Sequence, residues 1–153
     1  MAQLTEFLKK RKNEQSQKNI DVSKTKRQWL DALNSFFAMI KEWLNEPCAQ
    51  GLIEMHDDKV FITEELFGKY AAPSLIIRTE WAIINIEPMA RFVVGAQGRI
   101  NMSSTNGISC ILLYKTDSTF ADNQWLYFDK SYSLKTIPLS AELFDNLVQS
   151  MLS

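Results

Sequence analysis

Residues 74–103 read SLIIRTEWAIINIEPMARFVVGAQGRINMS, and this stretch decides the fold class. Short runs rich in β-branched and aromatic residues alternate there with proline, glycine or polar breaks, which is the pattern of successive β-strands. The breaks are too short to hold helical crossovers, so neighbouring strands are expected to pair antiparallel. The run WAIINI at 81–86 is nearly all apolar, which predicts a central strand at least partly covered on both faces.

The regions on either side of this stretch complete the predicted fold. Further strands are expected at 108–114, 124–129 and 134–137. Apolar residues recur at helical spacing from Trp29 to Leu44, and a second amphipathic stripe runs from Leu143 to Leu152 behind Ser140 as its N-cap. The sequence therefore predicts an α+β fold with a long N-terminal helix, an antiparallel meander sheet of about seven short strands, and a C-terminal amphipathic helix packed on the sheet.

The beginning of the long helix sets the predicted domain boundary. Thr25-Lys26-Arg27-Gln28 has the form of a capping box, so the helix is expected to begin near Thr25. Residues 9–24 are strongly polar and offer little to a core. Residues 1–24 are therefore interpreted as a basic polar leader, partly disordered or loosely helical, and residues 25–153 as a single α+β domain.

Two short elements are expected between the long helix and residue 74. LIEMHDDKVFI at 52–62 predicts a hairpin that turns at Asp57-Asp58, because aspartate tolerates turn conformations. ITEELFGKY at 62–70 predicts a short helix that Thr63 caps and Gly68 ends.

Composition and charge narrow the classes of function. The chain has 153 residues, a one-domain length, and Cys48 and Cys110 are expected to be reduced thiols. Residues 1–30 hold eight basic and three acidic residues, whereas residues 31–153 hold nine basic and fifteen acidic residues. The main part of the chain is therefore acidic, so we do not expect it to bind nucleic acid. No apolar run is long enough to span a membrane, and the first fifteen residues lack the apolar core of a signal peptide, so a cytoplasmic location is expected.

The stretch VVGAQGRI at 93–100 has two glycines, but it does not match a phosphate-binding loop. Such a loop needs a following helix, and the residues after Gly98 alternate as in a strand. Gly95 and Gly98 are therefore expected to bracket a tight hairpin in which they supply positive φ angles. Arg99 is either a solvated charge or a contact residue.

Signals for catalysis or metal binding are weak. His56 with Asp57 and Asp58 offers too few ligands for a closed metal site, and no serine or cysteine lies in a nucleophile elbow. A pair of converging carboxylates stays open as an alternative, from Glu80, Glu87, Asp117, Asp122 or Asp129. No cofactor and no metal are expected.

The candidate binding residues therefore point to contacts with another protein. Trp125, Tyr127 and Tyr132 would form an aromatic interface if they are exposed together, with Arg99 as a further contact residue; the alternative is that the aromatic residues are buried between sheet and helix. In the leader, the apolar residues Leu4, Phe7 and Leu8 precede a basic cluster that consists of Lys9, Lys10, Arg11 and Lys12. Either the leader is a solubilising tail, or the apolar residues fold against a partner while the basic cluster contacts its acidic surface.

The leading hypothesis is a small cytosolic protein-binding module without catalytic activity, such as an adaptor, an inhibitor or immunity-like protein, or a client-specific chaperone. Its partner would be another protein, with self-association through a sheet edge as a further option. The alternative is a small-ligand-binding protein or enzyme with a pocket between the curved sheet and the long helix. A third interpretation is contact of the basic leader with an anionic surface or with nucleic acid.

Overall fold

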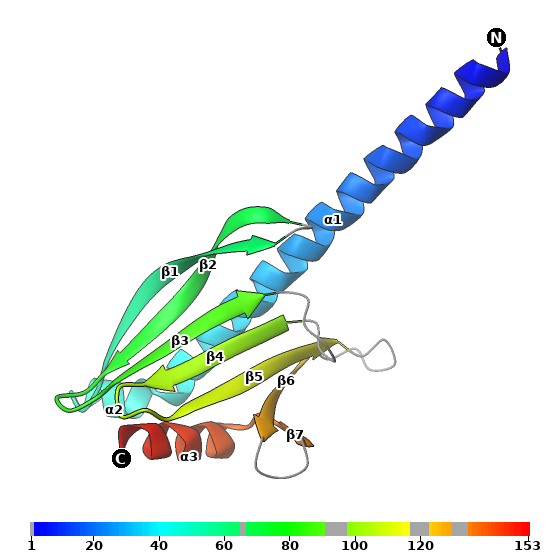
Figure 1. Ribbon diagram of the computed structural model, residues 1–153. Coiled ribbons are helices and arrows are strands. Elements are labelled where there is room, and N and C mark those ends of the chain that lie inside the picture. Colours follow the sequence, from blue (N-terminus) through cyan, green and yellow to red (C-terminus); the bar gives the residue numbers. More distant parts are fainter. Residues whose placement is uncertain (1, 65–66, 91–97, 117–122, 130–134) are drawn as a thin grey trace.

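A computed structural model of the chain describes residues 2–64, 67–90, 98–116, 123–129 and 135–153. It shows a long helix, a seven-stranded sheet and a C-terminal helix, which confirms the α+β prediction (Figure 1). The helices are α1 (Ala2–Trp43), α2 (Asn45–Ala49) and α3 (Ala141–Leu152). The strands are β1 (Glu54–Glu64), β2 (Gly68–Arg78), β3 (Ile83–Ala90), β4 (Gly98–Ser104), β5 (Ser109–Thr116), β6 (Asn123–Asp129) and β7 (Lys135–Pro138). They follow one another in sheet order β1 to β7, all antiparallel, so the meander prediction is also correct.

The long helix begins much earlier than the capping signal indicated. It runs without a break from Ala2, so the predicted start at Thr25 is wrong. Residues 2–24 contain neither glycine nor proline and are rich in lysine, glutamine and other good helix formers. Nothing in that segment therefore stops the helix from continuing through Thr25.

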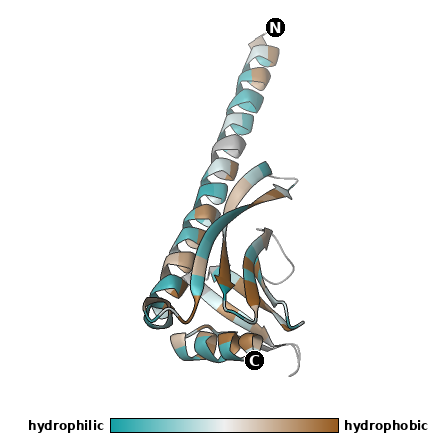
Figure 2. Ribbon diagram, turned by 90° about the vertical axis from the view of Figure 1, so that its left-hand side faces the viewer, coloured by the Kyte–Doolittle hydropathy of each residue, from teal (hydrophilic) through white to brown (hydrophobic). Residues whose placement is uncertain are grey.

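The core lies between α1, the inner face of the sheet and α3. The buried side chains of α1 that face it run from Trp29 to Ile40, and Leu44, just after the helix, continues the same face, as the helical spacing predicted. Alternate residues of the central strands meet them, and five of these have no exposed surface: Ile84, Ile86, Ile100, Met102 and Leu112. Phe144, Val148 and Met151 of α3 complete the core. Figure 2 shows the sheet on one side of α1 and α3 beneath it.

The hairpin of β1 and β2 replaces two elements that the sequence indicated. The eleven register pairs run from Glu54↔Arg78 to Glu64↔Gly68, so the predicted turn at Asp57-Asp58 and the predicted helix from Thr63 are wrong. The turn lies instead just before Gly68, whose φ of 70° suits glycine. A continuous ladder of this length outweighs local turn and cap preferences, which are weak.

The far half of this hairpin leaves the sheet and covers α1. Only Leu75–Arg78 of β2 pair with β3, and the rest of the hairpin lies away from that strand (Figure 1). There the indole Nε1 of Trp29 donates a hydrogen bond to the hydroxyl of Tyr70 at 3.1 Å, and that hydroxyl donates to Glu64. The core half of α1 is thus held between the sheet and the hairpin.

Gly98 has a different role from the one predicted, whereas Gly95 lies outside the described residues. The strands β3 and β4 pair antiparallel, as the predicted hairpin requires, but Gly98 is the first residue of β4, pairs with Tyr114 and does not have a positive φ, so the predicted positive φ is wrong. A Cβ atom at this position would lie 2.3 Å from Cζ3 of Trp29. The absence of a side chain therefore lets the indole lie directly on the strand.

The C-terminal helix is fixed at both of its ends. Its N-cap is Ser140, as predicted, and the Ser140 hydroxyl accepts a hydrogen bond from the Leu143 backbone N–H at 3.1 Å. At the other end, the side-chain amide of Asn106 donates to the carbonyl oxygens of Met151 at 2.7 Å and Ser153 at 2.9 Å. The Trp81 indole donates to the Leu152 carbonyl at 2.6 Å. Two turns of the sheet thereby satisfy carbonyls that a helix end leaves without partners.

Candidate functional site

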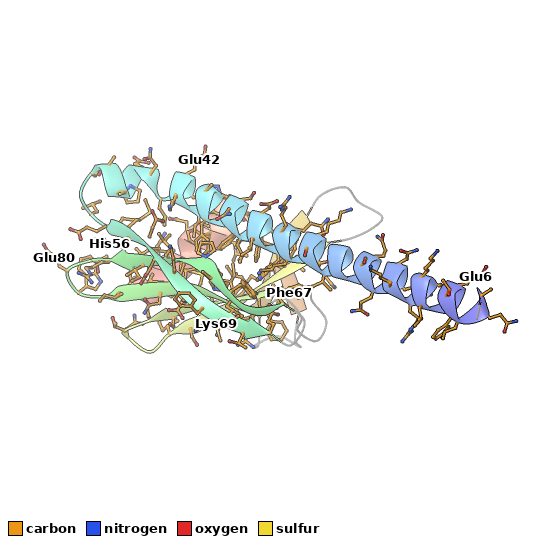
Figure 3. The ribbon with its side chains drawn as sticks, turned by 90° about the horizontal axis from the view of Figure 1, so that it is seen from above. Glu6, Glu42, His56, Phe67, Lys69 and Glu80 are labelled. Atoms are coloured by element: carbon orange, nitrogen blue, oxygen red, sulfur yellow. The ribbon has the colours of Figure 1, made fainter. Side chains whose placement is uncertain are left out.

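The first 23 residues of α1, from Ala2 to Lys24, project beyond the sheet, and we call this part the arm (Figure 1). Side chains 2–17 are all exposed. At a rise of about 1.5 Å per residue, the arm extends roughly 35 Å. Figure 3 places Glu6 near its far end, well away from the strands.

Three apolar side chains stand together near the end of the arm, and we call them the tip. Leu4, Phe7 and Leu8 are 53%, 59% and 56% exposed, although side chains of this kind are normally buried. Their spacing of three and four residues places them on one face of the helix. Within the described residues, the tip therefore offers an apolar surface that the fold itself does not use.

The segment between the tip and the body is polar and basic. Lys9, Lys10, Arg11 and Lys12 follow the tip directly, and all four are exposed. Arg11 lies 3.9 Å from the carboxylate of Glu14. A helix that is polar all round is typical of a segment that crosses solvent between two folded parts. The predicted basic cluster is thus carried on a helix beside an apolar tip.

A cleft of about 490 Å³ lies between α1 and the β1–β2 hairpin. Apolar side chains and backbone form much of its wall, and charged residues of α1 and β1 stand beside them. Its lining consists of Asn34, Phe37, Ala38, Lys41, Asp57, Asp58, Lys59, Ala71, Ala72, Pro73 and Ser74. Lys41 and Asp57 form an ion pair across it. Figure 3 labels Glu42 and His56, which neighbour this pair in the chain, at the end of α1 opposite the arm.

Two of the three aromatic residues predicted as an interface, Trp125 and Tyr127, lie on the inner face of the sheet. Trp125 and Tyr127 are partly buried and pack against the core. The Trp125 ring lies 4.6 Å from that of Phe36 and 6.2 Å from that of Trp29, measured between centroids. These contacts hold the sheet on α1, while Tyr132 lies outside the described residues. The structure does not bring Trp125 and Tyr127 together with the basic cluster of the arm.

Arg99 lies on the outer face, beside a shallow hollow of about 260 Å³ that β3, β4 and β5 form. Its Nε donates to the side-chain oxygen of Asn101 at 2.8 Å, and Glu87 lines the same hollow. Cys110 also lines it, and burial raises the pKa of its thiol to about 11. A thiol with so high a pKa is a poor nucleophile at neutral pH.

The remaining candidates for chemistry do not form a site. Nε2 of His56 lies 3.3 Å from a carboxylate oxygen of Glu54, and both side chains are exposed. Among the described residues, no group of three histidine, cysteine or acidic side chains could hold a metal ion. Glu80 lies between β2 and β3 and is exposed, while Asp117 and Asp122 lie outside the described residues. Asp129 is the last residue of β6.

No helix in the described part of the chain combines the length and apolar character that crossing a membrane requires. Searches against protein-family models, curated proteins and solved structures find no match to this chain.

The sequence identified the residues of the arm, but it named no residues for the pocket between sheet and helix that it offered as an alternative. Leu4, Phe7 and Leu8 were recognisable because their spacing is local. The cleft joins residues 34–41 to residues 57–59 and 71–74, and no local pattern links such distant segments. Moreover, the turn predicted at Asp57-Asp58 placed two of its residues in the wrong element.

Proposed function

We propose that this chain is a small cytoplasmic protein-binding module without catalytic activity, and that its arm is the docking element. The observation that carries the proposal is the exposed apolar tip at the end of a helix that extends away from a complete core. Burial of a Leu or Phe side chain contributes about 1.5–3 kcal/mol, so a partner that covers all three would gain substantial affinity.

The length of the arm supports the same proposal. Isolated helices are marginally stable in water, and tertiary contact usually supplies most of a helix's stability. Side chains 2–17 of the arm are exposed, so tertiary contact adds little to the stability of this part of the helix. A partner seated on the tip would supply the missing contact.

The chemistry of the arm indicates the kind of partner. Four consecutive basic residues adjoin the tip, so the complementary surface is an apolar pocket with acidic residues around it. The charges would speed encounter and orient the helix, while the tip would supply most of the affinity. An adaptor, an inhibitor or immunity-like protein and a client-specific chaperone would each use such an arm.

A pull-down from the native host with three purified proteins tests this proposal. The first is the full chain, the second carries Leu4→Ser, Phe7→Ser and Leu8→Ser, and the control carries Asn13→Ser and Gln15→Ser in the polar segment. We expect one protein to bind the full chain and the control in a stoichiometric complex, and to be lost from the tip variant. Raised salt should weaken the complex, because it screens the basic cluster.

Equal capture by the tip variant would contradict the proposal. A second copy of this chain as the captured protein would instead indicate self-association, which sedimentation of the purified chain would show directly. If the chain does self-associate, the surface to test besides the tip is β1, because it is the longer of the two edge strands of the sheet. Binding of the arm to anionic lipid vesicles, with no protein captured, would also count against a protein partner.

A further inference from the structure

The cleft between α1 and the β1–β2 hairpin has the size of a small-molecule site. Its volume of about 490 Å³ falls within the range of known ligand pockets, roughly 300–1,000 Å³. Phe37 and Ala38 of α1 and the run Ala71-Ala72-Pro73 of β2 supply apolar wall. Such a surface suits the apolar part of a molecule of amino-acid or dipeptide size.

One buried polar group in this wall has no partner. Ser74 is only 5% exposed, and its hydroxyl makes no hydrogen bond with any part of the chain that the structure describes. A buried polar group without a hydrogen bond costs free energy, and buried polar groups in proteins are nearly always paired. A hydroxyl both donates and accepts, so a polar group of a ligand in the cleft would satisfy it.

The charged residues of the cleft leave one cation and one anion available. Lys41 and Asp57 are already paired with each other. One carboxylate oxygen of Asp58 accepts the backbone N–H of Lys59 at 2.8 Å, and the other has no donor in the described part of the chain. The Lys59 ammonium has no acidic partner among the described residues either.

We infer that this cleft binds a small zwitterion with an apolar side chain, either a free amino acid or a dipeptide. Its carboxylate would pair with Lys59 and its ammonium with Asp58, because these are the two charged side chains in the lining of the cleft that form no ion pair with the described residues. Ser74 would bond to a polar group of the ligand, and the apolar side chain would lie against Phe37 and the β2 run. The site is separate from the arm and does not depend on the proposed docking role.

Binding to the purified full chain tests the inference, with calorimetry for affinity and amide chemical shifts for location. The probes are L-phenylalanine and L-leucyl-L-phenylalanine, which separate the two sources of the ligand. 3-Phenylpropionate and phenethylamine keep the apolar part but only one charge each. We expect at least one zwitterion to bind saturably and to shift residues of the cleft. Each single-charge analogue should bind about tenfold more weakly, because it lacks one of the two charge-assisted hydrogen bonds that the zwitterion would make.

Three variants locate the contacts. Lys59→Met should weaken the zwitterion about tenfold and leave phenethylamine unchanged, because it removes only the partner of the carboxylate. Ser74→Ala should weaken the zwitterion while leaving the melting temperature unchanged or higher, since it removes a buried hydroxyl that lacks a partner. Lys69→Met is the matched control, because Lys69 is on the same hairpin but lies over the Phe61 ring, 5.3 Å from its centroid.

Three results would overturn the inference. The first is that neither zwitterion binds saturably at millimolar concentration. The second is that 3-phenylpropionate or phenethylamine binds as tightly as the zwitterion. The third is that the ligand shifts only amides of residues outside the cleft. The tip variant Leu4→Ser, Phe7→Ser, Leu8→Ser should bind the zwitterion like the wild type. A result against ligand binding in the cleft is therefore distinguishable from a result against partner binding by the tip.

Discussion

Trp29 of α1 lies directly on Gly98 of β4, so closely that a Cβ atom at position 98 would be 2.3 Å from Cζ3 of the indole. The indole has no exposed surface, and the rings of Tyr114 and Trp125 lie 5.9 and 6.2 Å away. Trp29 therefore has little freedom to move aside. This contact sets how closely the long helix approaches the sheet.

Substitution of Gly98 by alanine should destabilise the fold by overpacking. We expect a loss of about 1–3 kcal/mol in the free energy of unfolding, measured by urea denaturation. In a Trp29→Leu background the same substitution should cost much less, because the smaller side chain leaves room for the added methyl group. An equal cost in both backgrounds would show that the contact with Trp29 is not the cause.

Asn106 should stabilise α3 through its side-chain amide. Asn106→Asp keeps the acceptor oxygen but loses the two hydrogen bonds to the carbonyls of Met151 and Ser153. It also places a negative charge at the negative end of the helix dipole. We expect a loss of about 1–3 kcal/mol and faster amide exchange in α3 than in the wild type. Unchanged exchange in α3 would contradict this role.

Phe144 should anchor α3 more strongly than Leu147 does. Phe144 is 1% exposed and packs with Trp43, whereas Leu147 is only partly buried. Phe144→Ala should therefore cost about 3–5 kcal/mol, and Leu147→Ala clearly less than that. Both values come from the same denaturation measurement, and a larger loss for Leu147→Ala would contradict the observed orientation of the helix.

Cys110 should make stability fall at alkaline pH. Burial raises the pKa of its thiol from 9.0 to about 11, so the unfolded chain loses this proton at a lower pH than the folded chain does. The resulting contribution to stability is complete below pH 9 and is lost as the pH rises towards 11. Cys110→Ala should reduce the difference in unfolding free energy between pH 8 and pH 10.5, and Cys48→Ala serves as the control. If Cys110→Ala shows the same difference in unfolding free energy between the two pH values as the wild type, the raised pKa of Cys110 is contradicted.

The sequence predicted the elements whose signals are local and uninterrupted. The alternation in residues 99–103 and the apolar run in 108–114 identify β4 and β5, and Ser140 marks the start of α3. The helical spacing from Trp29 also identified the core half of α1, because burial on one face imposes that spacing.

The errors occurred where long-range pairing overrode a local signal. Asp57 and Asp58 favour a turn, yet both lie in β1 because eleven residue pairs join that strand to β2. Gly98 resembled a turn glycine, but this position needs glycine because the Trp29 side chain occupies the space of a Cβ atom, and Trp29 lies far away in the sequence. The residues that line the cleft were missed for the same reason, since Ser74 and the α1 residues come together only in the folded chain.

Photo-crosslinking from the arm in the native host tests the central claim most directly. A photoreactive amino acid replaces Phe7 in one protein and Asn13, in the polar segment of the same helix, in another. If the tip is the docking element, position 7 should give a crosslink to one protein, and position 13 should give much less of it. Equal crosslinking from both positions, or no protein crosslinked from position 7, would contradict the claim that this chain binds its partner through the tip.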